Sequence, residues 1–130
     1  GEKLTLVGRS PMEKIQVPNY IPPDQQKYYS SAIIGFNSGQ VLPALFLLRT
    51  LIEQFARSEI TDPSLNSADK VMNEYKATLP DDFKRNFPSL HHIYDELSAA
   101  IHTANESTEL FIRSKEGIDR HFDARRSFNL

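Results

Sequence analysis

The chain has 130 residues, no cysteine and a formal net charge of −2 at pH 7. This length suits one compact domain, and the lack of cysteine excludes disulfides, zinc ribbons and thiol nucleophiles. The small net charge gives no strong overall attraction to nucleic acid or acidic lipid. The longest apolar run, VLPALFLL, is far too short to span a bilayer. We therefore expect no membrane partner and, because nothing requires an oxidising compartment, a cytoplasmic protein.

Residues 1–23 predict an extended N-terminal arm. KLTLVG at 3–8 could form a short strand, and VPNYIPP at 17–23 is expected to be extended because proline disfavours helix at itself and at the residue before it. The arm either lies on the domain or is a loosely ordered linker. The chain begins at Gly1 rather than Met, so we expect the remainder, 24–130, to be a domain of a larger protein whose other domains are its partners.

Apolar residues recur at helical spacing through the remainder of the chain. Five helices are expected, over about 24–37, 40–58, 67–79, 88–102 and 107–126. The second is apolar on nearly all sides, which predicts a place at the centre of the fold. The segment at 80–88 is expected to be a short irregular or helical turn. The sequence therefore predicts an all-α, up-and-down bundle of about five helices.

Local signals define where the helices begin and end. Gly39 suits a left-handed cap after the first helix, and Ser67 can cap the third. Pro88 is expected at the first helical position of the fourth helix. Thr103 and Glu106 match a capping box that would begin the fifth.

Arg49 and Glu53 are charged residues on the otherwise apolar second helix. Their i, i+4 spacing allows them to pair along one face. Charges among apolar neighbours are costly unless they are paired. They are expected either to line a polar pocket or interface, or to form an ion pair on the one wet stripe of that helix.

Tyr94, Ser98 and His102 follow one another at intervals of four on the fourth helix, so they share one stripe. His102 is the group best able to transfer a proton near neutral pH. Ser98 lies inside a helix rather than on an exposed elbow, which disfavours a serine hydrolase. The alternative is structural, with Ser98 bonded to its own helix and His102 a satisfied histidine.

No metal site or cofactor is expected. His91 and His102 are about 16 Å apart along a helix axis, too far to share one ion. His91 and Asp95, at i, i+4, could hold an adventitious surface ion at most. Near the C-terminus basic and acidic residues alternate, which is typical of a solvated face rather than a nucleic-acid site. The basic residues there are Arg113, Lys115, Arg120, Arg125 and Arg126.

Two stretches carry a resemblance to a known family. AIIGFNSGQVLPALFLLRTLIEQFAR at 32–57 and LHHIYDELSAAIHTANESTELF at 90–111 resemble the HEPN superfamily of small helical-bundle domains, most strongly its bacterial members of unknown function. In those proteins an early helix carries Arg and then Glu on one face, which Arg49 and Glu53 match. A histidine just before the last helix is matched by His102.

The resemblance implies an all-α bundle that dimerises through the helices bearing these motifs. Many active members are metal-independent RNases of toxin–antitoxin and antiviral systems, with an Arg a few positions before the His. Here those positions hold Asp95, Glu96 and Leu97. None offers the cationic fork that arginine presents to a phosphate, and the two acids would repel it.

Two hypotheses follow for the function. The first is a non-catalytic, homodimeric interaction or regulatory module within a larger bacterial or phage-related protein. The alternative is an endoribonuclease that binds RNA or a nucleotide, with His102 as the acid–base group and Arg49 or Arg113 stabilising phosphate charge. Ser98 and Tyr94 would then orient the ribose or phosphate.

Overall fold

A computed structural model describes residues 15–62 and 64–130, and the strand expected at 3–8 lies outside them. Within this part of the chain the fold is all-α, as predicted, and contains no strand. Its α-helices are α1 (Gln26–Asn37), α2 (Val41–Glu59), α3 (Ala68–Ala77), α4 (Asp81–Asn86), α5 (Leu90–His102) and α6 (Thr108–Ser127). The expected turn at 80–88 thus contains a helix, α4, so that the described part has six α-helices.

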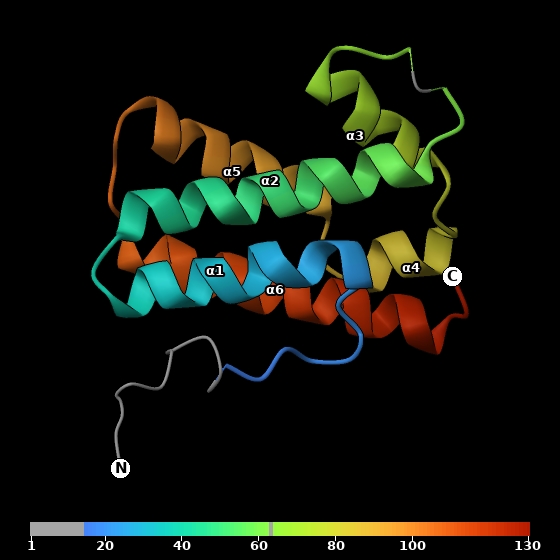
Figure 1. Cartoon of the computed structure of the whole chain (residues 1–130). Helices are drawn as coiled ribbons and strands as arrows, with labels where there is room; N and C mark the ends of the chain where they lie inside the picture. The colour runs from blue at the N-terminus through green and yellow to red at the C-terminus, as the bar shows by residue number, and fades with distance from the viewer. Residues whose placement is uncertain (1–14, 63) are drawn as a thin grey trace.

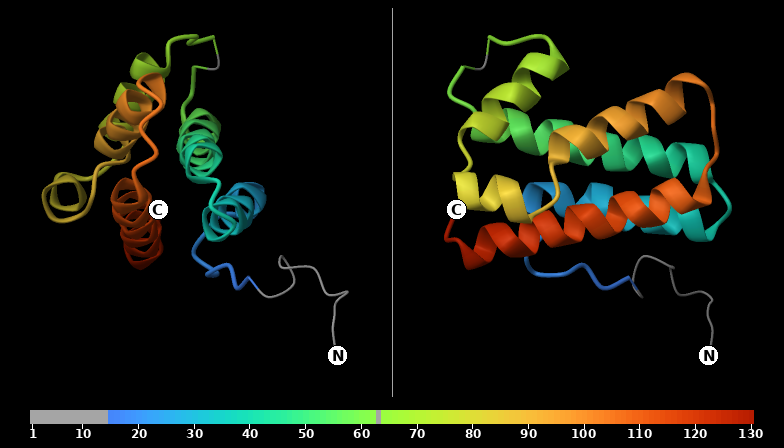
Figure 2. Two further views of the ribbon diagram at one scale, coloured as in Figure 1. Left: turned by 90° about the vertical axis from the view of Figure 1, so that its left-hand side faces the viewer. Right: turned by 180° about the vertical axis from the view of Figure 1, so that it is seen from behind.

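The helices form two layers (Figure 2). α1 and α2 run antiparallel in one layer, and α5 and α6 run antiparallel in the other, while α3 and α4 lie at one end of the bundle (Figure 1). α2 packs against α1, α3, α5 and α6, which confirms its central position. Among its residues Leu45, Leu51 and Ile52 are fully buried, whereas Phe46 is 42% exposed. One side of the central helix therefore remains open.

Serine side chains cap three of the helices at their N-termini. Ser67, Ser89 and Ser107 accept hydrogen bonds from backbone N–H groups in the first turns of α3, α5 and α6. Ser67 was expected. Pro88 is not the first helical residue, because Ser89 supplies the cap that a proline cannot. Thr103 is the residue at the C-terminal end of α5, so the capping box expected there is wrong.

Residues in the left-handed backbone conformation follow three of the helices. Gly39 has φ 79°, as expected, and Ala104 and Asn129 have φ 52° and 58°. After α5, the Ala104 N–H bonds Ile101 O at 3.0 Å and the Asn105 N–H bonds Ala100 O at 2.8 Å. This pair of bonds satisfies carbonyls at the end of the helix. The reversal at Ala104 is the reason why Thr103 cannot begin α6.

The described end of the arm packs on the bundle. Ile21 lies on the arm side of the expected boundary, yet it is fully buried, and its carbonyl accepts a bond from Gln26 Nε2 at 3.1 Å. Nearby, Tyr29 Oη of α1 donates to Asp119 Oδ1 of α6 at 2.8 Å. Burial, and then this carboxylate, raise the pKa of Tyr29. The Tyr29–Asp119 bond joins the two layers beside the arm.

We predict that Ala104→Gly stabilises the protein. An alanine in the left-handed conformation costs about 1–2 kcal/mol, which glycine does not incur. The greater freedom of glycine in the unfolded chain offsets part of this gain in stability. The free energy of unfolding should rise by about 0.5–1 kcal/mol, measured by urea denaturation. Gly39→Ala is the matched control and should lower it. A lower stability for Ala104→Gly would contradict the left-handed conformation of Ala104.

Candidate functional site

A polar cluster lies between α2 and α5 and contains four of the residues singled out in the sequence. Arg49 Nη1 donates to Ser98 Oγ at 3.5 Å, and Tyr94 Oη donates to Glu53 Oε1 at 3.3 Å. All four side chains are half-buried. Arg49 and Glu53 of α2 thus face Ser98 and Tyr94 of the antiparallel helix α5, one pair from each of the two layers.

The ion pair of Glu53 differs from the expected one. Glu53 Oε2 lies 2.9 Å from Arg57 Nη2, and Arg57 also donates to Leu65 O at 2.9 Å. A glutamate pairs better with a cation four residues after it than with one four residues before it. Arg49 instead lies over the ring of Phe46, 5.0 Å from its centroid.

Tyr94 acts as a hydrogen-bond donor in this cluster. Burial raises the pKa of Tyr94, and the neighbouring Glu53 carboxylate raises it further, while Arg49 opposes both. The phenol therefore keeps its proton at neutral pH and donates it to Glu53. The cluster offers hydrogen-bond donors and one carboxylate. The raised pKa of Tyr94 disfavours the phenolate form that would act as a general base.

His102 lies at the edge of the cluster. It is the last residue of α5, one turn beyond Ser98, and it is exposed. Its imidazole forms no hydrogen bond with any other described residue. It is therefore accessible to a ligand or partner but is not oriented by a neighbour, as the base of a catalytic pair would be.

A second polar network has the fully buried side chains of Tyr75 and His121 at its centre, and the sequence did not reveal it. Tyr75 Oη lies 2.6 Å from His121 Nε2, and His121 Nδ1 lies 2.8 Å from Pro88 O. A carbonyl only accepts, so Nδ1 carries the proton and Nε2 accepts from Tyr75. Arg125 donates to Tyr75 Oη at 3.1 Å and to Glu59 Oε1 at 3.0 Å. These bonds join α2, α3, α6 and the start of α5.

His121 is neutral in the folded protein. Burial lowers its pKa from 6.5 to about 4, and Arg125 contributes in the same direction, while the bond to Pro88 acts against them. The sequence signal for a buried His121 was its position on the apolar face of α6. It lies three residues after Ile118 and next to Phe122. The partner Tyr75 is far away in sequence and could not be inferred from spacing.

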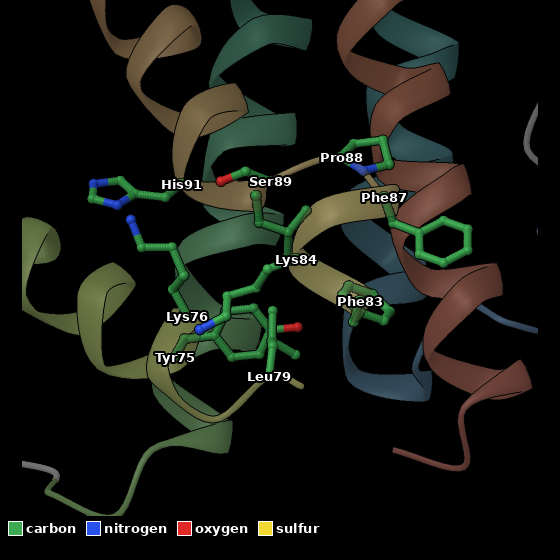
Figure 3. A pocket seen from close by; sticks show the side chains of 10 residues that line it. Tyr75, Lys76, Leu79, Phe83, Lys84, Phe87, Pro88, Ser89 and His91 are labelled. Atoms are coloured by element: carbon green, nitrogen blue, oxygen red, sulfur yellow. The ribbon is translucent and has the colours of Figure 1, made fainter. Parts of the chain in front are cut away.

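A small pocket lies beside this network, between α3, α4 and the start of α5 (Figure 3). Apolar side chains make up most of its lining. Lys76 and Lys84 line it together with His91. It is separate from the polar cluster of α2 and α5, because the two share no residue.

The basic residues near the C-terminus mostly face acids. Lys115 lies 3.0 Å from Asp119, and Arg113 lies 3.4 Å from Glu96. The surface of α6 is therefore mixed in sign, as its sequence predicts, rather than a positive stripe.

No protein-family model, no curated protein and no solved structure matches this chain. Among the described residues, no helix combines the length and apolar character needed to cross a bilayer. The resemblance of the two stretches to the HEPN superfamily therefore stays a prediction, and the contacts above are the structural basis for a functional proposal.

We predict that His121 makes stability depend on pH. Its pKa is lower in the folded state, so the unfolded chain binds the proton first, and stability falls as the pH falls from 6.5 to about 4. The size of the shift corresponds to about 3 kcal/mol. His121→Asn keeps a donor for Pro88 O but does not titrate. Between these pH values, urea denaturation should show that the free energy of unfolding falls less in the variant than in the wild type. An equal fall would contradict the role of His121.

Proposed function

We propose that the bundle is a HEPN-like interaction module that forms a homodimer through its α2–α5 surface. We define this surface as Phe46, Arg49, Glu53, Tyr94 and Ser98. The observation that carries the proposal is Phe46, which is 42% exposed on a helix whose other large apolar residues are buried or half-buried. An exposed aromatic beside arginine and tyrosine matches the composition of interface centres.

The charges of the α2–α5 surface suit a second copy of the chain. A two-fold axis places one surface against itself, so that each residue meets its counterpart's neighbours. Within residues 15–62 and 64–130, Arg49 makes a long hydrogen bond to Ser98 and a contact with the ring of Phe46, and one oxygen of Glu53 accepts from Tyr94. A copy related by two-fold symmetry can therefore present a carboxylate to Arg49 while the two Phe46 rings leave water.

The module is proposed to be regulatory rather than catalytic. The positions before His102 that would hold an arginine carry Asp95 and Glu96, and Glu96 already faces Arg113 at 3.4 Å. A phosphate approaching His102 along α5 meets these acids. We place this module in the cytoplasm, within a larger bacterial or phage-related protein whose assembly it would control by dimerising.

One observation supports a second candidate, an endoribonuclease of toxin or antiviral type. Arg49 Nη1 donates to Ser98, which lies one turn from His102. The guanidinium of Arg49, from α2, therefore lies beside the part of α5 where the expected arginine is missing. In this candidate His102 transfers the proton of the ribose hydroxyl, and Arg49 stabilises the charge on phosphate.

We predict that Phe46→Glu weakens the dimer at least tenfold, because it places two like charges at the centre of a two-fold contact. Analytical ultracentrifugation from low to high micromolar concentration measures the dissociation constant. Ile112→Glu is the matched control, since Ile112 is 58% exposed on α6 and outside the surface. A wild-type protein that stays monomeric, or equal effects of both variants, would reject the proposed interface.

A separate prediction tests the ribonuclease. Purified wild-type protein should leave mixed RNA intact, and so should His102→Ala, if the module is not catalytic. RNA cleavage by the wild type that is lost in both His102→Ala and Arg49→Ala, monitored on denaturing gels, would establish the second candidate in its place. Equal cleavage by all three proteins would indicate a contaminant and exclude both residues from catalysis.

A further inference from the structure

A third group of polar side chains joins α3 to α5, outside the α2–α5 surface. His91 Nε2 lies 3.0 Å from Asp69 Oδ1 and 3.7 Å from Asp95 Oδ2. One atom from each of the three residues lies within 4.8 Å of the others. Two of the residues come from α5 and the third, Asp69, from the first turn of α3. The imidazole nitrogen therefore faces two carboxylates from different helices.

We propose that Asp69, His91 and Asp95 bind a divalent first-row transition-metal ion. One imidazole nitrogen and two carboxylate oxygens are a ligand set that Zn²⁺, Mn²⁺ and Fe²⁺ accept. Two carboxylates also balance the charge of a divalent cation. Three protein ligands leave positions open for water or a small ligand, as in metal sites that are not purely structural.

Neighbouring contacts hold two of the ligands in place. Asp69 Oδ2 accepts from Asn73 Nδ2 at 3.4 Å, which leaves Oδ1 directed at His91. The His91 side chain is only 13% exposed, so its ring has little freedom to turn away. Outer contacts of this kind orient ligands and reduce the reorganisation needed for binding.

The same helix supplies an internal comparison. His92 and Glu96 also lie at i, i+4 on α5, 3.7 Å apart, with the His92 side chain 72% exposed. That pair resembles His91 and Asp95 in spacing and distance, but no third ligand from α3 joins it. A site that depends on Asp69 must therefore distinguish the two histidines.

The pocket next to His91 introduces a competing charge. Lys76 lines it together with His91 (Figure 3), and an ammonium nearby opposes a bound cation. Replacing Lys76 by methionine keeps the apolar stem and removes the charge. This variant should bind the metal ion at least as tightly as the wild type.

The test is calorimetric titration of the full chain with Zn²⁺ alone, in a buffer that does not chelate it. The wild type should bind one ion per chain. His91→Ala and Asp69→Asn should each weaken binding at least tenfold, while His92→Ala should leave it unchanged. Circular dichroism checks that every variant is folded, and Zn²⁺ should raise the unfolding temperature of the wild type but not of His91→Ala.

Three outcomes would overturn the site, and a fourth would contradict the argument about the charge of Lys76. No saturable binding by the wild type would reject it outright. An unchanged affinity in Asp69→Asn, or equal losses in His91→Ala and His92→Ala, would reduce it to adventitious ion binding by helix histidines. Weaker binding by Lys76→Met would contradict the charge argument. None of these outcomes depends on the dimer, because the ligands lie outside the α2–α5 surface.

Discussion

The burial of helix α2 is the constraint on which the rest of the fold depends. It packs against α1, α3, α5 and α6, and its residues Leu45, Leu51 and Ile52 are fully buried. A helix that is apolar on most sides gains stability only if neighbours cover those sides. Packing α5 antiparallel to α2 is what brings Ser98 to Arg49 and Tyr94 to Glu53. The polar cluster is thus a product of this packing.

The buried Tyr75–His121 network controls where α5 begins. His121 donates to Pro88 O, just before the Ser89 cap, so α6 holds the residues from which α5 starts. Tyr75 of α3 closes the same network. His121 thus connects α3, which carries Asp69, to the residue two before the start of α5, which carries His91. The same histidine would thereby help to hold together the two helices that carry the proposed metal ligands.

The sequence predicted the features that depend on local spacing. Helical periodicity located the long helices to within a few residues, and Gly39 marked a left-handed cap because only short-range backbone geometry is involved. Ala104 gave no such signal, since alanine rarely adopts that conformation. The capping box at Thr103 was therefore a false match.

Tertiary contacts explain the remaining differences between expectation and structure. The sequence predicted that Arg49 and Glu53 pair on one face, but Glu53 pairs with Arg57, whose guanidinium also donates to Leu65 O in the loop before α3. Asp69 and Tyr75 meet their histidines only because α3 folds back against α5 and α6. Such pairs need the packing of whole helices, which a single sequence does not specify.

The two roles proposed for helix α5 involve two of the three helices that pack against it, α2 and α3. Tyr94 and Ser98 face α2, whereas His91 and Asp95 meet Asp69 of α3. Positions three apart differ by about 60° around a helix, so the two pairs lie on neighbouring strips of α5, with His91 and Asp95 nearer its N-terminus. A dimer formed over α2 would leave the α3 side open to solvent. The proposed metal site and the proposed dimer surface thus use different residues of α5.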